Sequence, residues 1–249
     1  MSYIKTSQEL QKIKKSGAIL REVVDILVPS IKAGMTTNEI DDTAEALIVE
    51  HGGTSSFKTV SGYSWTTCLP INEQAVHTPP TDRVLQDGDI LTVDIGAVYG
   101  GFHTDYATTI AIGTVPESTK DFLEKGEKTL EKAIKMFKDG TRVGEISHFI
   151  EKQIEGGGYC ILKELTGHGV GKELHEKPYI LNYLDRPIEK TLLLQSGMTL
   201  AVEIIYAQST EHIAYERELE WSIISADRSL SACFEKSIAV DKEEPFILT

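Results

Sequence analysis

The sequence has few cysteines and no long apolar run. Its three cysteines, Cys68, Cys160 and Cys233, are far apart and form no CxxC pair, which argues against a disulfide framework and against a cysteine zinc site. No segment approaches the roughly 20 apolar residues of a membrane span, and the polar amino terminus lacks the apolar stretch of a signal peptide. We therefore expect a cytoplasmic protein that does not enter the membrane.

Basic residues are also in short supply. The 25 lysines and arginines are outnumbered by 38 acidic residues, which gives a formal net charge of −13, and no basic run interrupts this excess. Such a chain is not expected to bind the phosphate backbone of nucleic acids. Apolar side chains make up 41% of the 249 residues, enough for a large core.

Local patterns predict a mixture of helices and strands. The capping-box spacing of Thr6 and Glu9 predicts a helix that runs to about residue 31, with Pro29 bending or ending it. Further helices are predicted at about 37–51, 118–137 and 143–154. Residues 87–113 predict a β-hairpin around the turn Tyr99-Gly100-Gly101. Strands are predicted near 199–208 and 217–241.

An internal repeat relates the two halves of the chain. QDGDILTVDI (86–95) and QSGMTLAVEI (195–204) align at an offset of 109, which sets Asp94 against Glu203. AGMTTNEI (33–40) and DGTRVGEI (139–146) align at an offset of 106. These matches predict a single α+β domain over 1–249, with pseudo-symmetric halves at about 1–115 and 116–249. Helices would pack outside one curved sheet, with a site at the junction. Ordinary helix-then-sheet sequence is the alternative explanation.

Four carboxylates interrupt the predicted strands. Asp94 lies in LTVDIG, Asp105 follows eleven residues later across the hairpin turn, and Glu203 and Glu235 lie in TLAVEIIYA and ACFEKSIAV. A buried carboxylate is costly unless it is protonated, paired or bound to a cation, and facing carboxylates repel each other. Two such residues in each half predict a metal cluster. Taken singly, each remains open to interpretation as a structural or solvated acid.

Three of the seven histidines fall in suggestive segments: His77 in NEQAVHTPP, and His168 and His175 in TGHGVGKELHEKP. Their spacing does not fit the HExxH helix of zinc peptidases. A set of four carboxylates and one imidazole favours Mn, Fe, Co or Zn, and shared carboxylates would bridge two ions. Two such ions acidify a water and polarise a carbonyl, which favours hydrolysis of an amide.

Four segments resemble the motif blocks of the type I methionine aminopeptidases, which have the pita-bread (creatinase/aminopeptidase) fold: VDIGAVYGGFHTD, GHGVGKELHEKP, GMTLAVE and DRSLSACFEKSIAV. The resemblance extends from about residue 4 to residue 240. It implies that two divalent metal ions are bound by Asp94, Asp105, His168, Glu203 and Glu235. It also implies attack of a metal-bridging hydroxide on the peptide carbonyl, with Glu203 shuttling protons, and it leaves the choice among Co, Mn, Fe and Zn open.

The same resemblance assigns roles around the metal ligands. His77 would contact the substrate amide near the leaving group, and His175 would stabilise the oxygen of the tetrahedral intermediate. The residues implied for the pocket of the methionine side chain are Tyr63, Cys68, Trp221, Phe57 and Leu174.

Several positions depart from the family pattern. Thr78 stands where glycine is usual, Ile204 where proline is usual and Leu174 where phenylalanine is usual, and Phe57 also alters the pocket wall. We expect the metal site to survive these changes. They leave open how strictly the pocket selects methionine.

The resemblance implies a cytoplasmic enzyme that removes the initiator methionine from nascent chains whose second residue is small. Its expected partner is a peptide or nascent-chain amino terminus; transient ribosome contact is left open, and no nucleic acid or membrane is expected. No coiled-coil heptad is present, which favours a monomer. Two alternatives remain: an aminopeptidase P or prolidase relative that selects proline after the scissile bond, and a non-catalytic pita-bread binding protein.

Overall fold

A large antiparallel sheet forms the centre of the computed structural model, which describes residues 3–249. Its strands are β1 (Thr54–Ser55), β2 (Thr67–Cys68), β4 (Ile90–Tyr99), β5 (Phe102–Ala111), β6 (Cys160–Ile161), β7 (Thr166–Gly169), β8 (Glu176–Leu181), β9 (Thr199–Ala207), β12 (Ser231–Ala239) and β13 (Phe246–Ile247). The main path through this sheet has the order β1-β4-β5-β12-β9-β7-β8. A smaller sheet contains β3 (Gln74–Val76), β10 (Ile213–Tyr215) and β11 (Ile223–Ser225).

All four predicted helices are confirmed, with ends within three residues of the expected positions: α1 (Ser7–Ser30), α2 (Thr37–Glu50), α3 (Glu117–Ile134) and α4 (Val143–Glu155). The capping box at the start of α1 is present, because the Glu9 backbone donates to the Thr6 hydroxyl and the Thr6 backbone donates to the Glu9 carboxylate. Pro29 lies one residue before the end of α1. Short 3₁₀ turns occupy Phe57–Thr59 and Ile188–Lys190.

The predicted hairpin consists of β4 and β5, which pair along their whole length from Ile90 opposite Ala111 to Tyr99 opposite Phe102. Gly100 and Gly101 have φ values of 59° and 79°. This is the left-handed backbone that a two-residue hairpin turn of this kind requires and that glycine adopts without a steric cost.

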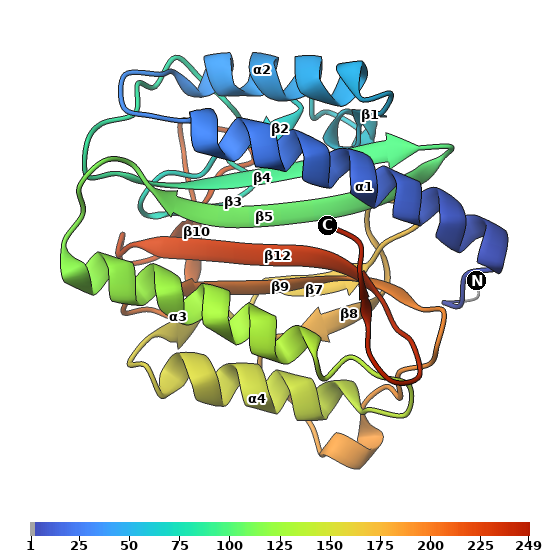
Figure 1. The fold of residues 1–249 in the computed structure, drawn as a ribbon. Helices are drawn as coiled ribbons and strands as arrows, with labels where there is room; N and C mark the ends of the chain where they lie inside the picture. The colour runs from blue at the N-terminus through green and yellow to red at the C-terminus, as the bar shows by residue number, and fades with distance from the viewer. Residues whose placement is uncertain (1–2) are drawn as a thin grey trace.

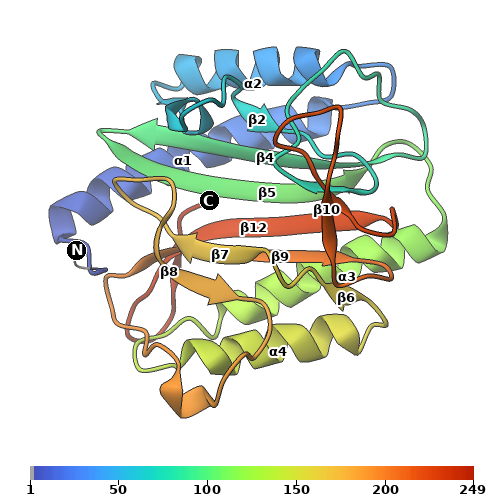
Figure 2. The same ribbon diagram turned by 180° about the vertical axis from the view of Figure 1, so that it is seen from behind.

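Within residues 3–249, the helices cover one face of the large sheet and leave the other without a helix (Figure 1). The cluster that contains Val93 and Ile95 of β4 is filled by residues of α1 and α2, and the cluster that contains Val202 and Ile204 of β9 is filled by residues of α3 and α4. Side chains alternate between the faces of a strand. Every second residue of these strands therefore points to the opposite face, which the small sheet and loops partly cover (Figure 2).

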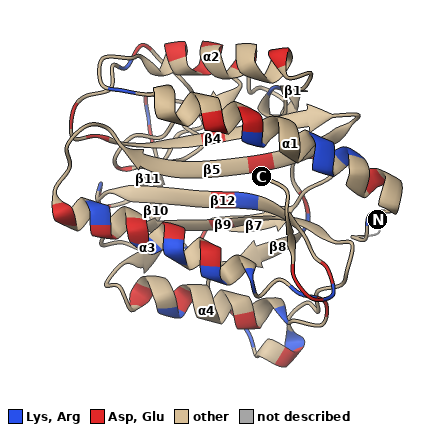
Figure 3. Ribbon diagram, viewed as in Figure 1, with Lys and Arg blue, Asp and Glu red and all other residues tan. Residues whose placement is uncertain are grey.

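Charged residues concentrate on helices and loops, whereas the strands are mostly uncharged (Figure 3). Asp105 is the only charged residue of β5. Acidic side chains on the central strands are therefore exceptions that call for a partner. None of the helices in the described part of the chain combines the length and apolar character needed to cross a bilayer.

The predicted pita-bread class, with helices outside an antiparallel sheet, is confirmed. The β4–β5 hairpin and the β9–β12 pair meet at the β5–β12 boundary, but the division into one domain with halves at 1–115 and 116–249 stays a prediction. The segment predicted as strand at 217–241 is interrupted, because only Ile223–Ser225 and Ser231–Ala239 are strands and a turn separates them. No strand was predicted for β7 and β8.

Candidate metal centre

The registers of the central strands bring the four predicted carboxylates onto one face. Asp94 lies opposite Ala107 in the ladder between β4 and β5. Ala107 also lies opposite Glu235 of β12, and Glu235 lies opposite Glu203 of β9. Asp105 precedes Ala107 by two residues and therefore shares its face. The small side chain of Ala107 leaves room between the acids on either side.

His168 reaches the same place from β7, where it pairs with Ala201, two residues before Glu203. Its Nε2 lies 3.3 Å from Glu203 Oε1 and 4.0 Å from Asp105 Oδ2. The other ring nitrogen, Nδ1, lies 2.9 Å from the backbone oxygen of Gly169. Donation of an Nδ1 proton to that oxygen would leave the Nε2 lone pair directed at the carboxylates.

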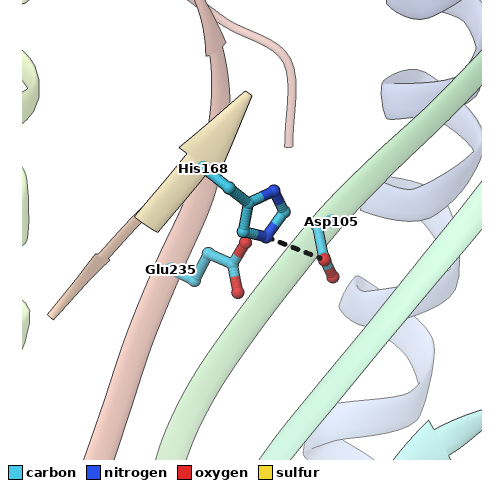
Figure 4. Close-up of side chains that lie close together, drawn as sticks. All are labelled: Asp105, His168 and Glu235. Carbon is cyan, nitrogen blue, oxygen red and sulfur yellow. Dashed lines mark ion pairs between the residues drawn. The ribbon is translucent and has the colours of Figure 1, made fainter. Parts of the chain in front are cut away.

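Two groups of side chains are close enough to share a metal ion. One potential ligand atom from each of Asp105, His168 and Glu235 lies within 4.8 Å of the others, and the same holds for Glu203, Cys233 and Glu235. Figure 4 shows the His168 ring extending toward Asp105, with Glu235 beside it. Glu235 belongs to both groups, which is the position that a bridging carboxylate would occupy.

The electrostatics of the cluster fit a bound cation. Burial raises the pKa of Asp105 to about 7. Burial and then the neighbouring Asp105 carboxylate raise the pKa values of three more acids: Asp94, Glu203 and Glu235. Within residues 3–249, Glu235 Oε1 is buried without a hydrogen-bond partner. Crowded, buried carboxylates with an unpartnered oxygen are the donor set that a divalent ion would neutralise.

The imidazole of His168 is also suited to bind a metal. Burial, followed by the nearby His175, lowers the pKa of His168 to about 4. The ring is therefore neutral near pH 7, with a nitrogen lone pair available to an ion. An oxygen-rich set with one imidazole fits first-row divalent metals better than thiophilic ions.

The two outer histidines, His77 and His175, line the same cavity as the proposed metal ligands. Both His77 and His175 are exposed. The rings of His168 and His175 are 4.5 Å apart between centroids. His77 has a φ of 59°, so its backbone is in the left-handed region, and its side chain lines the cavity from there.

An apolar pocket adjoins the acids within this cavity. Phe57, Tyr63, Cys68 and Leu174 form a buried cluster against which Trp221 packs. The rings of Tyr63 and Trp221 pack edge to face, with 5.5 Å between their centroids. All five side chains line the cavity together with the carboxylates, so the structure brings together every residue that the sequence assigned to the site.

Three further lining residues, Val60, Val76 and Cys233, were not identified from the sequence. Cys233 could have been identified from the sequence, since it precedes Glu235 by two residues in a strand and must share its face. Val60 and Val76 lie in irregular or short segments, and nothing in their local sequence distinguishes them from core residues.

Residues 11–242 match the sequence profile of metallopeptidase family M24. The chain belongs to this family. This M24 metallopeptidase is 36% identical over 249 residues to methionine aminopeptidase 1 of Bacillus subtilis, a match that covers 100% of this chain and 99% of the relative. It also superposes on the crystal structure of a methionine aminopeptidase from Thermotoga maritima with a TM-score of 0.95 and 34% identity, over 99% of this chain and 98% of the other.

A solved structure of lower sequence identity shows similarity of the fold alone. The prolidase of Pyrococcus furiosus superposes with a TM-score of 0.78 at 22% identity, and the match covers 99% of this chain but 65% of the prolidase. The predicted resemblance to methionine aminopeptidases is thus confirmed over the full length of the M24 chain. The roles of individual residues stay predictions.

Proposed function

We propose that this M24 metallopeptidase is a methionine aminopeptidase that removes the initiator methionine from nascent chains whose second residue is small. The observation that carries the proposal is the junction of an apolar, aromatic pocket with a cluster of carboxylates in one cavity. The full-length similarity to methionine aminopeptidases supports this reading over a prolidase-like specificity or a non-catalytic binding protein.

We propose that two divalent ions, chosen from Co, Mn, Fe and Zn, are held by Asp94, Asp105, His168, Glu203 and Glu235. When bound, such ions supply Lewis-acid activation of a peptide carbonyl and of a water. Glu203, which lies within reach of the same ions, would accept a proton as a carboxylate and return it to the leaving amine.

The outer histidines and the apolar pocket would bind the substrate. His77 would hold the substrate amide and His175 the carbonyl oxygen, since both rings line the cavity beside the carboxylates. The walls formed by Tyr63, Cys68 and Trp221 fit a methionine side chain, because the flexible thioether makes favourable contacts with aromatic edges. Leu174 and Phe57 complete the same pocket.

We further infer that the protein acts in the cytoplasm as a monomer, with the amino terminus of a nascent chain as its substrate. The excess of acidic residues, with a net charge of −13, supports the absence of a nucleic-acid partner. Transient contact with the ribosome stays a prediction.

Hydrolysis of Met-Ala-Ser by purified protein, with Co or Mn added, tests the proposal. Methionine release by the wild type and its loss in Glu203→Gln, an isosteric change that removes one charge, would support the function and the role of Glu203. A panel of Met-Ala, Met-Gly and Xaa-Pro peptides separates the two aminopeptidase specificities. Wild-type protein that binds two metals but cleaves only Xaa-Pro peptides would overturn the methionine assignment.

A further inference from the structure

Two residues that line the candidate site have an unusual backbone conformation. Among residues 3–249, positive φ outside glycine occurs at Asn72, His77, Trp221 and Arg228. His77 has a φ of 59° and Trp221 a φ of 79°, and both side chains line the cavity. Such a backbone is energetically unfavourable for a residue with a side chain, and it persists only where surrounding contacts enforce it.

The residues that follow His77 and Trp221 are joined to each other. The hydroxyl oxygens of Thr78 and Ser222 are 2.9 Å apart, and either hydroxyl can act as the donor. The exposed fractions are only 3% for Thr78 and 1% for Ser222. A buried hydroxyl pair of this kind is costly to break, because each partner would be left without a hydrogen bond.

Backbone hydrogen bonds fix both ends of this hydroxyl bridge. The Thr78 carbonyl accepts from the backbone of Leu69 at 2.8 Å, and the Ser222 carbonyl accepts from the backbone of Glu216 at 3.0 Å. The antiparallel pairing of β3 with β11 includes Ile223 opposite Val76. The bridge therefore links the neighbouring ends of the two strands: Thr78 lies just beyond His77 at the end of β3, and Ser222 lies between Trp221 and the start of β11.

We propose that the Thr78–Ser222 bridge is a positioning device that holds His77 and Trp221 in their left-handed conformations. It thereby fixes the position of the His77 imidazole relative to the Trp221 ring, which packs against the apolar pocket. The inference rests on the proposed function, in which Trp221 contacts the substrate side chain and His77 the amide. Neither hydroxyl-bearing residue lines the cavity, so Thr78 and Ser222 act through their neighbours. The bridge couples recognition of the side chain to catalysis.

Thr78→Val removes the hydroxyl and keeps the shape, whereas Thr78→Ser keeps the hydroxyl. At matched metal content, Thr78→Val is expected to lower kcat/KM for Met-Ala-Ser by about tenfold, the equivalent of one hydrogen bond, with a lower kcat and a higher KM. Thr78→Ser should retain activity close to the wild type. Ser222→Ala should match Thr78→Val, and the double variant should be no worse than either single variant, because both remove the same bond.

A spectroscopic measurement decides the proposal without substrate. The chain has two tryptophans, Trp65 and Trp221, so Trp221 is the only one in a Trp65→Phe background. Its near-ultraviolet circular dichroism should change on Thr78→Val and return with Thr78→Ser. An unchanged Trp221 signal, or equal kinetics in Thr78→Val and the wild type, would overturn the bridge as a positioning device. If the wild type releases no methionine, the proposed function fails, while the Trp221 signal still tests the bridge.

Discussion

The hydroxyl of Ser237 is hydrogen bonded to both backbone groups of Asp105. The Asp105 N–H donates to Ser237 Oγ at 2.8 Å, and Ser237 Oγ lies 3.0 Å from the Asp105 carbonyl oxygen, to which it donates. Thr249 Oγ1 donates to the same carbonyl at 3.0 Å and accepts from the Ser237 N–H at 2.8 Å. The direct ladder between β5 and β12 ends one residue before Ser237. Two hydroxyls therefore take over the connection beside the proposed ligands Asp105 and Glu235.

Thr249→Val is expected to lower the free energy of unfolding by about 1–3 kcal/mol, because it leaves the buried Ser237 N–H without an acceptor. It should also weaken metal binding, since the strands that carry Asp105 and Glu235 lose a link. Urea denaturation and calorimetric titration of the metal-free protein with Mn measure the two effects. Thr249→Ser, which keeps the hydroxyl, is the matched control. Equal stability of Thr249→Val and the wild type would refute the role of this hydroxyl.

Removal of metal should reveal the repulsion within the acidic cluster. The folded pKa of Asp105 is raised from 3.8 to about 7, so its contribution to stability is fully present below pH 4 and is lost as the pH rises through 7. In metal-free protein at pH 8, Asp105→Asn should therefore be more stable than the wild type, on the order of 2 kcal/mol, with the gain gone near pH 4. Asparagine keeps the oxygen that accepts from the Tyr106 N–H.

Saturating Mn should reverse this order, because a ligand that binds the folded state at 100 times its Kd adds about 2.7 kcal/mol to stability. Thermal unfolding with and without a chelator, at pH 4 and pH 8, measures all four conditions. A metal-free Asp105→Asn protein that is less stable than the wild type at pH 8 would contradict the account of the cluster.

Local sequence was sufficient for the helices and the main hairpin. Their signals lie within a few residues, as in the capping box of Thr6 and Glu9 or the turn at Gly100 and Gly101. Strands β7 and β8 escaped prediction because TGHGVGKELHEKP shows no alternation of apolar and polar residues. The pairing of β7 depends instead on β9, which lies opposite His168 and Gly169, and β8 pairs in turn with β7.

The candidate ligands could be identified because a carboxylate in an apolar strand is unusual in itself. Asp94 and Glu203 stand out for this reason without any knowledge of the fold. The Ser237 and Thr249 hydroxyls carry no such signal, since serine and threonine are common in strands and loops. Their partner, Asp105, is 132 residues from Ser237 and 144 from Thr249. Only the folded chain reveals which hydroxyls support the site.

Asp41 anchors the strand beside the apolar pocket, and its loss should affect substrate binding. One carboxylate oxygen, Oδ1, accepts from the backbone N–H groups of Thr66 and Thr67 at 3.0 and 2.7 Å. The Thr67 carbonyl in turn accepts from the Tyr63 hydroxyl. Asp41→Ala should lower the free energy of unfolding by about 2–3 kcal/mol and raise KM for Met-Ala-Ser more than it lowers kcat. Asp41→Asn, which retains Oδ1, should be milder in both respects; equal damage from the two variants would exclude this explanation.

Glu176 should give the loop that carries His175 a stability that depends on pH. Burial opposes the charge of Glu176, but hydrogen bonds from Lys5 Nζ at 2.6 Å and from the backbone of Lys172 and Glu173 outweigh it and lower the pKa below 4.5. A lowered folded pKa stabilises the protein above pH 4.5, and this stability is lost as the pH falls through the folded pKa. Glu176→Gln should therefore cost about 1 kcal/mol at pH 7, allowing for partial exposure, and less as the pH falls below 4. Urea denaturation at pH 7, 5 and 3.5 measures the difference, and Glu173→Gln in the same loop is the control. A difference that stays constant over this range would show that Glu176 acts through its shape, and that its charge does not stabilise the loop.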